Sequence, residues 1–458
     1  LISFFSVLNI LYSIYFDFIL DLNSYLITFL ISFTIGFSFW YIGRNHSKNF
    51  SLIDQMAFIV LIFLFIPLLI SIPYIFSIYN MSFLNSYFES VSGFTTTGFS
   101  IIENINDIDD PLILWRASSQ WIGGLIFLII TIGTIGSKQI KIKPAYLISG
   151  GASGINFYNN FKYNFMKIIL IYFFSTLFVI FLYSLVDIRL LDAFSLAFTI
   201  ISSGGFVPAN DLSSIIINNL QIFILSLTLL FPIFNFFLFH DIITGQFSFR
   251  NHQEDFYLAI LIILLTLFFY FLVIPNIEFA SLLFVITSSI STSGIATYSS
   301  NFDLPLFFIL LPIVGGSLIS TSSGFKYTRI YILLKISYNE IYKLVKPINI
   351  VDKNLYNSDT KIQDQDVKIA FLVFLSFIIS IFILSSILAF DYLTFENSFK
   401  LSILTLTNTV NSSLYGMDNL NFLDLNNFTK ISLIFFMILG KIEIIAVIYL
   451  IKKFIFRE

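Results

Sequence analysis

The chain contains no cysteine, only three histidines and few charged residues for its length of 458. Without cysteine it can form no disulfide, no thiolate nucleophile and no thiol-bound metal site. The histidines, His46, His240 and His252, lack the spacing typical of metal ligands, and we expect surface or interfacial roles for them. Charged residues make up 11% of the chain and hydrophobic residues 57%. A soluble domain of this size would carry far more charge, so the sequence predicts a polytopic membrane protein.

Other absences argue against nucleic-acid binding and against enzymatic activity. The chain has no basic block of the kind that binds nucleic acid, so we expect no nucleic-acid partner. It has no Gly-rich loop ending in Lys-Ser/Thr that would hold nucleotide phosphates, and no cluster of catalytic carboxylates or histidines. We therefore expect a protein that is not an enzyme and that needs no organic cofactor. The first apolar run lacks a basic start and a small-residue cleavage site, which favours a retained helix over a signal peptide.

Four short polar segments interrupt the apolar sequence, each between two hydrophobic stretches. In the first three, ten positions separate a phenylalanine from a glycine: Phe88 and Gly98, Phe194 and Gly204, and Phe284 and Gly294. The fourth keeps this spacing with Leu401 and Asn411. Because the flanking runs are long enough to cross a bilayer, the sequence predicts four tandem units of outer helix, re-entrant pore loop and inner helix. Repeats in one direction argue against a secondary transporter with inverted repeats.

The predicted fold is all-α, with the four units arranged pseudo-fourfold around an ion pore and ten full spans in total. The predicted parts are two N-terminal transmembrane helices over 1–45, units over 56–137, 165–245, 256–335 and 367–456, and a cytosolic linker over 336–366. The linker mixes both signs of charge, as expected of a docking surface or of a plain solvated loop.

Positive charge is distributed unevenly across the predicted spans. With both termini in the cytosol, 20 of the 24 Lys and Arg residues fall inside, and the remaining four are Arg116, Arg189, Lys400 and Lys430. This bias predicts a multi-pass protein of the cytoplasmic (inner) membrane with both termini cytosolic. Fourteen of the 27 Asp and Glu residues fall outside or in the pore mouth. They would form a negative vestibule that concentrates cations; the alternative is that they only reflect outer loops poor in Lys and Arg.

The residue types of the polar segments suit an ion path. Main-chain carbonyls from four loops can replace the hydration shell of a hard monovalent cation, and Ser and Thr hydroxyls can satisfy neighbouring backbone groups. The predicted filter residues are Thr96, Thr97, Gly98, Ser202, Ser203, Gly204, Thr292, Ser293, Gly294, Thr409, Val410 and Asn411. Asn411 takes the place of the fourth glycine, and asparagine tolerates a left-handed backbone well. Gly416, five residues later, is the alternative in that loop.

Six motifs lie in register along the chain, at residues 89–98, 115–124, 202–206, 291–294, 315–326 and 440–443. In this order they resemble the first filter loop, the start of the first inner helix, the second and third filter loops, the broken third inner helix and the fourth inner helix of the Trk/Ktr/HKT superfamily of potassium transporters. The resemblance covers about residues 56–456. The two additional N-terminal helices are closer to the Trk branch than to the minimal Ktr core.

The resemblance implies potassium uptake, with dehydrated K⁺ held in single file by main-chain carbonyls of the four loops. It also implies a homodimer in the membrane lipid, in which each subunit has its own pore, and a separate cytosolic RCK nucleotide-binding subunit that regulates the pore. The alternative is a Na⁺-permeable or Na⁺-coupled member of the same superfamily, which is prompted by Asn411.

The resemblance also implies a gate below the filter. Its residues are Gly315, Gly316, Ser317, Ser320, Thr321, Ser322, Ser323, Gly324 and Lys441. Such a polar break at mid-membrane is tolerated only beside water or protein, although the glycines could instead serve tight helix packing. Lys441 stands where the family usually has arginine, and we interpret it as an electrostatic barrier or as the partner of an acid such as Glu443. We expect Arg116 to pair with Glu89 or Asp110 and to hold the first loop.

Overall fold

The computed structural model describes residues 1–18, 22–44, 52–77, 79–135, 157–273, 277–297, 304–346, 353–356, 361–391, 393–417 and 420–442. In these residues the regular structure is helical, apart from one isolated bridge between Asn354 and Lys361. Six helices in this part of the chain are long and apolar enough to cross a membrane: Leu22–Gly43, Asp54–Phe76, Asp110–Ile132, Phe165–Leu185, Gln253–Val273 and Asp364–Ala389. The predicted all-α polytopic fold class is confirmed.

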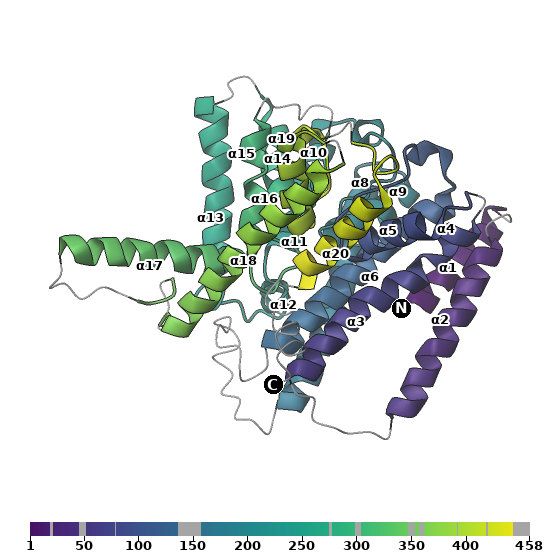
Figure 1. Ribbon diagram of the computed structural model, residues 1–458, viewed down its shortest axis with the longest axis horizontal. Coiled ribbons are helices and arrows are strands. Elements are labelled where there is room, and N and C mark those ends of the chain that lie inside the picture. The colour runs from purple at the N-terminus through teal and green to yellow at the C-terminus, as the bar shows by residue number, and fades with distance from the viewer. Residues whose placement is uncertain are drawn as a thin grey trace.

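Two N-terminal helices flank the four units. Helix α1 (Ile2–Tyr15) packs against α2 (Leu22–Gly43) and against the first inner helix, and α2 contacts the first outer helix. The pair lies at one edge of the molecule (Figure 1). Large apolar side chains of α2, such as Phe33 and Trp40, are exposed, as expected for a surface that faces lipid.

Each unit begins with an outer helix and continues with a short pore helix. The outer helices are α3 with α4 (Leu52–Ile70 and Ile72–Phe76), α8 (Phe157–Leu185), α13 with the π-helical turn η3 (Gln253–Phe268 and Phe269–Val273), and α18 (Asp364–Ala389). The pore helices are α5 (Phe83–Phe94), α9 (Leu190–Ile201), α14 (Phe279–Ile290) and α19 (Phe395–Leu406). Each pore helix has 12 residues, which corresponds to about 18 Å and thus to little more than half of a bilayer core.

After the filter loop, three of the units form a short 3-10 turn on their way to the inner helix. These turns are η1 (Ile105–Asp107), η2 (Leu212–Ser214) and η5 (Ser413–Tyr415).

The four inner helices differ from one another. The first is one long helix, α6 (Asp110–Ile135), and the described part of the fourth is α20 (Asn427–Ile442). The second is divided into α10 (Asn219–Thr228), α11 (Leu230–Ile233) and α12 (Phe236–Ile243). The third consists of α15 (Pro305–Phe308), α16 (Leu311–Val314), a loop over 315–326 and α17 (Tyr327–Val345).

The second inner helix is sharply bent. It turns by 104° between Ile233 and Phe236. Pro232 lies in the last turn before the bend, and the side chain of Asn235 accepts a hydrogen bond from Phe237 N at 3.0 Å, which starts a new helix there. Proline at the end of one helix and asparagine at the N-cap of the next favour such a break.

The third unit departs from its predicted end. Helix α17 runs through residue 335 to Val345, so the first part of the predicted linker 336–366 is helical. Figure 1 shows α17 lying across the direction of α13 and α18. Part of the predicted linker, and the end of the fourth unit from residue 443 on, lie outside the described residues.

Candidate filter and gate

The four pore helices end in the same backbone turn. Two residues beyond each helix, Thr96, Ser203, Thr292 and Asn408 take positive φ angles of 60°, 58°, 62° and 49°. Positive φ is uncommon for residues other than glycine, and most of all for β-branched threonine, so its recurrence at equivalent places marks a shared structure. It also supplies a register for the four loops that does not depend on residue type.

In this register the residues two positions later are Gly98, Gly205, Gly294 and Val410. A Cβ added to Gly98 would lie 2.8 Å from the Cα of Gly205, and one added to Gly294 would lie 3.0 Å from the carbonyl oxygen of Val410. A Cβ on Gly205 would collide with Cβ of Val410. The four loops therefore converge at one level, where three of them need the small volume of glycine.

The register of the turns differs by one residue from the predicted filter register in two of the loops. The second loop presents Gly205 rather than Gly204, whose added Cβ would collide with the Gln120 side chain, and the fourth presents Val410 rather than Asn411. The cause lies in the spacing, because Phe194 precedes its turn by one residue more, and Leu401 by one residue less, than Phe88 does. Gly416 ends the turn η5 with φ 63° and does not replace either residue.

Hydroxyl pairs brace three of the loops, as expected of serine and threonine. The side-chain oxygens of Thr95 and Thr97 lie 2.7 Å apart, those of Ser291 and Ser293 2.9 Å apart, and those of Thr407 and Thr409 3.0 Å apart. The second loop has Gly204 at the corresponding place, and there the Ser202 hydroxyl donates to Phe198 O at 2.8 Å.

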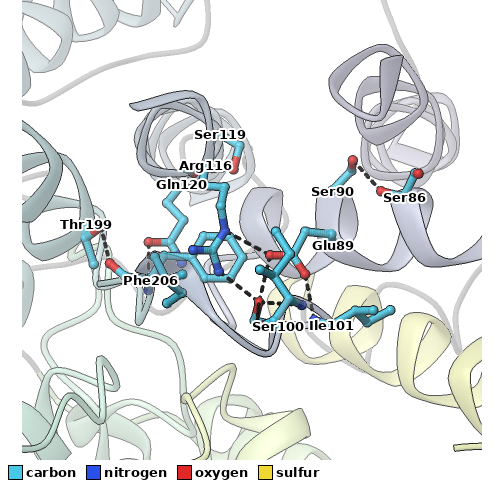
Figure 2. A network of polar contacts seen from close by, with 12 residues as sticks. Ser86, Glu89, Ser90, Ser100, Ile101, Arg116, Ser119, Gln120, Thr199 and Phe206 are labelled. Carbon is cyan, nitrogen blue, oxygen red and sulfur yellow. Dashed lines mark hydrogen bonds and ion pairs between the residues drawn. The ribbon is translucent and has the colours of Figure 1, made fainter. Parts of the chain in front are cut away.

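A buried ion pair holds the first loop at the outer mouth. Arg116 on α6 contacts Glu89 on α5 at 3.0 Å, and both side chains are at most 2% exposed. The other oxygen of Glu89 accepts a hydrogen bond from Ile101 N at 2.8 Å, and Ser100 Oγ lies within hydrogen-bond distance of both charged groups. Figure 2 shows the two charged side chains pointing at each other across the loop. The predicted pairing of Arg116 with Glu89 is confirmed, whereas Asp110 pairs with Arg189 at 2.7 Å.

The second loop is fixed to α6 and to its own pore helix through Phe206. Its N–H donates to the Gln120 side chain at 3.3 Å, and its carbonyl accepts from Thr199 Oγ1 at 2.8 Å (Figure 2). The guanidinium of Arg116 lies over the Phe206 ring, 4.2 Å from its centre. Arg116 thereby joins the first two loops. The resemblance marked the 115–124 motif, but the sequence did not indicate this role of Gln120.

The motif at the start of α6 is explained by packing. Trp115 donates to Ile70 O at 3.1 Å, and Trp121 donates to Thr176 Oγ1 at 3.0 Å, so each indole anchors α6 to an outer helix. An added Cβ on Gly123 would collide with the carbonyl of Phe94, the last residue of α5. The glycines therefore let α6 approach the ends of the pore helices closely.

Asn408 is a loop residue that the sequence did not indicate. Its amide nitrogen donates to Thr97 Oγ1 at 3.0 Å and to Met437 O at 2.8 Å, which ties the fourth loop to the first loop and to α20. The clue was an asparagine next to the threonines of an otherwise apolar segment, since a buried amide needs partners.

Above the filter lies an open cavity of about 410 Å³. Its lining includes Gly98, Glu103, Arg116, Gly205, Val410 and Asn411. Asn411 donates to Met417 O at 3.2 Å, so its side chain braces the mouth of the fourth loop. Glu103 provides a carboxylate at the same level, in keeping with the negative vestibule expected from the sequence.

Below the filter, the segment 315–324 forms a buried loop that folds back on itself. Gly315 and Gly324 have φ angles of 64° and 79°. An added Cβ on Gly315 would collide with Ser323 O, and one on Gly324 with Pro312 O. Both glycines are therefore required by the backbone where the two ends of the loop meet.

This loop contacts the ends of two pore helices directly. Ser203 Oγ donates to Thr321 O, and Thr321 Oγ1 donates to Ile201 O, both at 2.9 Å. Ser323 N donates to Thr292 Oγ1 at 3.0 Å. The residues with positive φ thus connect the filter loops with the predicted gate loop.

Lys441 enters the same contact from α20. Its Nζ donates to Thr96 Oγ1 at 2.6 Å, to Ser323 Oγ at 3.0 Å and to Thr321 O at 3.3 Å. These partners are neutral, and within the described residues Lys441 makes no ion pair; Glu443, the acid proposed from the sequence, lies outside them. The ammonium also lies 4.5 Å from the centre of the Phe127 ring, where it gains a cation–π contact.

A second lysine holds the loop from within. Lys326 Nζ donates to Ser322 O at 2.6 Å and to Ser317 O and Ser320 O at 3.2 Å each, and it lies 5.6 Å from the centre of the Phe127 ring. Two ammonium groups therefore lie near one aromatic ring below the filter. Lys326 ended the predicted 315–326 motif, but nothing in the sequence showed that its side chain binds the loop's carbonyls.

A surface position, one of the two expected of the histidines, is wrong for His252. This side chain is buried, with 3% of the residue exposed, and lies between Asp241 and Asp255 at the start of α13.

Comparisons with known proteins agree with the fold. The chain is 26% identical over 434 residues to an uncharacterised cation transporter of Methanocaldococcus jannaschii, covering 90% of this chain and 84% of that protein. It is 25% identical over 435 residues to the Trk system potassium uptake protein TrkG of Escherichia coli, covering 92% and 88%. The crystal structure of the potassium transporter TrkH from Vibrio parahaemolyticus superposes with a TM-score of 0.78 at 21% identity, over 98% of this chain and 97% of that chain. No protein-family model matches the sequence.

Proposed function

We propose that the chain is a member of the Trk/Ktr superfamily of potassium transporters. In this proposal it is the ion-translocating membrane subunit of a Trk-type system and carries K⁺ into the cell across the cytoplasmic membrane. The observation that supports this most is the convergence of four equivalent loops, each following a pore helix that reaches only part of the way through the membrane. The relatives named as Trk potassium uptake proteins support the choice of ion.

In this proposal, K⁺ loses its water in the outer cavity and is held by main-chain carbonyls of the loops. The proposed filter residues are 96–98, 203–205, 292–294 and 408–410, which the register of the turns supports. The pore helices direct their partly negative C-terminal ends toward the ion path, which favours a cation there. An inside-negative membrane potential drives entry, by about 2.3 kcal/mol per 100 mV for one charge.

The gate is proposed to be the loop 315–324 together with Lys441. The loop contacts the inner ends of the second and third pore helices, and Lys441 connects the loop with Thr96 of the first. A cation that leaves the filter would meet the ammonium groups of Lys441 and Lys326 close to its path, which raises the barrier to passage. Opening requires the loop to release its hydrogen bonds to Ser203 and Thr292 and to move aside.

The assembly is proposed as a homodimer in the membrane, regulated by a cytosolic RCK subunit, with both termini in the cytosol. The dimer and the RCK subunit follow from the resemblance of the six motifs to the Trk/Ktr/HKT superfamily, and the uneven distribution of Lys and Arg supports the orientation.

A Na⁺-permeable pore is the second candidate function. The residue that favours it is Val410 and not Asn411. Val410 occupies the level at which the other loops have glycine, and its side chain packs against Gly205. A bulkier residue there changes the width of the filter and with it the preference between K⁺ and the smaller Na⁺.

Rubidium uptake tests the proposal. The chain is expressed in cells that lack their own potassium transporters, with and without an RCK subunit, and external K⁺ or Na⁺ is added as competitor. We expect uptake that K⁺ blocks and Na⁺ does not. Equal block by both ions would favour the Na⁺-permeable pore, and no uptake under either condition, with the protein present in the membrane, would contradict the proposal.

A further inference from the structure

A buried charged cluster lies beside the bend of the second inner helix. It consists of Asp241, at the end of α12, and of His252, Glu254 and Asp255, at the start of α13. Asp241, His252 and Asp255 are each at most 4% exposed. Buried charges are costly unless paired, so such a cluster away from the filter calls for a role.

The first arm of this cluster reaches the bend. Asp255 accepts a hydrogen bond from Asn235 N at 2.8 Å, and Asn235 is the residue that starts α12 after the bend. On either side of Asn235 the backbone pairs with the gate loop: Ser317 N donates to Ile233 O at 2.8 Å, and Phe236 N donates to Ile319 O at 3.0 Å. The position of the bend and the position of the loop are therefore linked through main-chain hydrogen bonds.

The second arm reaches the loop directly. Glu254 accepts a hydrogen bond from Leu318 N at 3.1 Å and another from the hydroxyl of Thr328 on α17. Two neighbouring acids at the start of α13 thus hold the loop from two sides, one at the bend and one at the loop itself.

His252 joins the two helices that carry these acids. Its Nε2 lies 3.1 Å from Asp241 on α12, and its Nδ1 lies 3.4 Å from Asp255 on α13. The same Asp241 also contacts Nδ1 of His240 at 2.9 Å. An imidazolium between two carboxylates attracts both, whereas a neutral imidazole can donate only one hydrogen bond and leaves one carboxylate without a donor from it.

We propose that His252, in its protonated form, is a positioning residue that fixes the bend between α11 and α12 beneath the gate loop, so that protons on the cytosolic side set how firmly the loop is held. This inference rests on the proposed function of the loop as a gate. It follows from the contacts of His252 with Asp241 and Asp255 and from the backbone pairing of the bend with the loop.

The titratable groups around His252 determine the direction of the effect. Burial lowers the pKa of His252, but hydrogen bonds to Asp255 and Asp241 outweigh it and raise this pKa above the ordinary value of 6.5. His240 on α12 and Glu254 on α13 are the other titratable groups of these helices near it, and exposed Arg250 precedes it in the connecting segment. We call the contact of protonated His252 with both Asp241 and Asp255 the clamp. Because the folded-state pKa of His252 is raised, the clamp is fully formed below about pH 6.5 and is lost as pH rises through the raised value.

Cysteine labelling can report the position of the loop, because the chain has no cysteine of its own. Leu318→Cys places a thiol in the loop, and Leu334→Cys places one on α17 at a residue that is 66% exposed. The full chain is reconstituted into proteoliposomes, and the ratio of the two labelling rates with a maleimide is measured between pH 6 and pH 8, which cancels the pH dependence of the thiol itself.

In the otherwise wild-type background we expect the labelling ratio to rise about fivefold from pH 6 to pH 8. His252→Gln should remove this dependence, whereas His240→Gln, the matched control that shares Asp241, should keep it. Asp241→Asn, which retains His252, should shift the midpoint to lower pH by roughly one unit and serves as the second variant if His252→Gln does not fold. A ratio that is independent of pH, or one that keeps its dependence in His252→Gln, or an unchanged midpoint in Asp241→Asn, would overturn the inference.

Rubidium flux through proteoliposomes that contain the cysteine-free chain separates this inference from the proposed function. A pH-dependent labelling ratio without any flux, even with an RCK subunit present, would contradict transport and leave the clamp intact. Flux combined with pH-independent labelling would contradict the clamp and leave transport intact.

Discussion

At the ends of the pore helices the four units are nearly equivalent, whereas their inner helices all differ from one another. Four pore helices of 12 residues end in one shared left-handed turn. Beneath them, the first inner helix is continuous, the second bends by 104°, the third is broken by a loop, and the fourth contributes Lys441.

The proposed filter and gate account for this difference. An ion held by carbonyls on all sides needs similar ligands from every unit, which favours equivalent loops. A gate needs one element that moves against others that stay in place, which favours unequal inner helices. Substitutions in the filter loops can break the equivalence of the four units there, and substitutions beneath them can test how the inner helices differ.

The largest effect is expected from Gly98→Asp. Gly98 has φ 85°, and its added Cβ would lie 2.8 Å from Gly205 Cα, so a side chain both strains the turn and intrudes between two loops. Rubidium uptake should fall by about 100-fold or more, which corresponds to ~2.7 kcal/mol in the barrier. Gly36→Ala on α2, where nothing lies within 4 Å, is the control and should be neutral. Unchanged uptake by Gly98→Asp would remove Gly98 from the filter.

Glu89→Gln should destabilise the outer end. It leaves the buried guanidinium of Arg116 without its counter-charge, at a cost of roughly 3–5 kcal/mol in the free energy of unfolding. Thermal unfolding of the purified protein measures the loss. Asp110→Asn is the control, because its partner Arg189 is 62% exposed and such pairs are worth about 0–1 kcal/mol. Equal losses in both variants would show that burial of the Glu89 pair is not what stabilises the loop.

Lys441→Ala should increase transport by removing a positive charge near the ion path. We expect the rate of rubidium uptake to rise roughly tenfold, equivalent to a barrier lower by ~1.4 kcal/mol. Lys430→Ala is the control, since Lys430 lies near the outer start of α20 and donates to Asn85 at 3.1 Å. Loss of the folded protein, without any gain in rate, would instead assign Lys441 a structural role.

The smallest effect is expected from completing the ring of glycines. Val410→Gly makes the fourth loop like the other three and should sharpen the preference for Rb⁺ over Na⁺ by about fivefold, or ~1 kcal/mol. Asn411→Gly should change it little, because Asn411 lies one residue beyond the shared level and braces Met417. Competition by Na⁺ during rubidium uptake measures both, and the reverse order would restore the register deduced from the sequence.

Much of the architecture was predictable because it depends on local composition. Long apolar runs must cross the membrane, polar Gly- and Ser-rich breaks within them must be buried, and the distribution of Lys and Arg predicts their orientation. The pairing of Arg116 with Glu89 was also predictable, since an isolated charge inside a membrane protein requires a partner.

What the sequence could not supply was the position of one unit relative to another. Counting from Phe194 and Leu401 gives a register that differs by one residue from that of the shared turns in two loops, because the length of a pore helix beyond a given apolar residue is fixed by tertiary packing and not by residue type. The neutral partners of Lys441, the burial of His252 and the joining of the loop to the bend at Asn235 arise between segments far apart in the chain. By itself, then, the sequence determined which segments enter the membrane, because transfer from water depends on each segment's own side chains. Only the tertiary structure decided which groups meet around the pore, because that depends on how the helices pack.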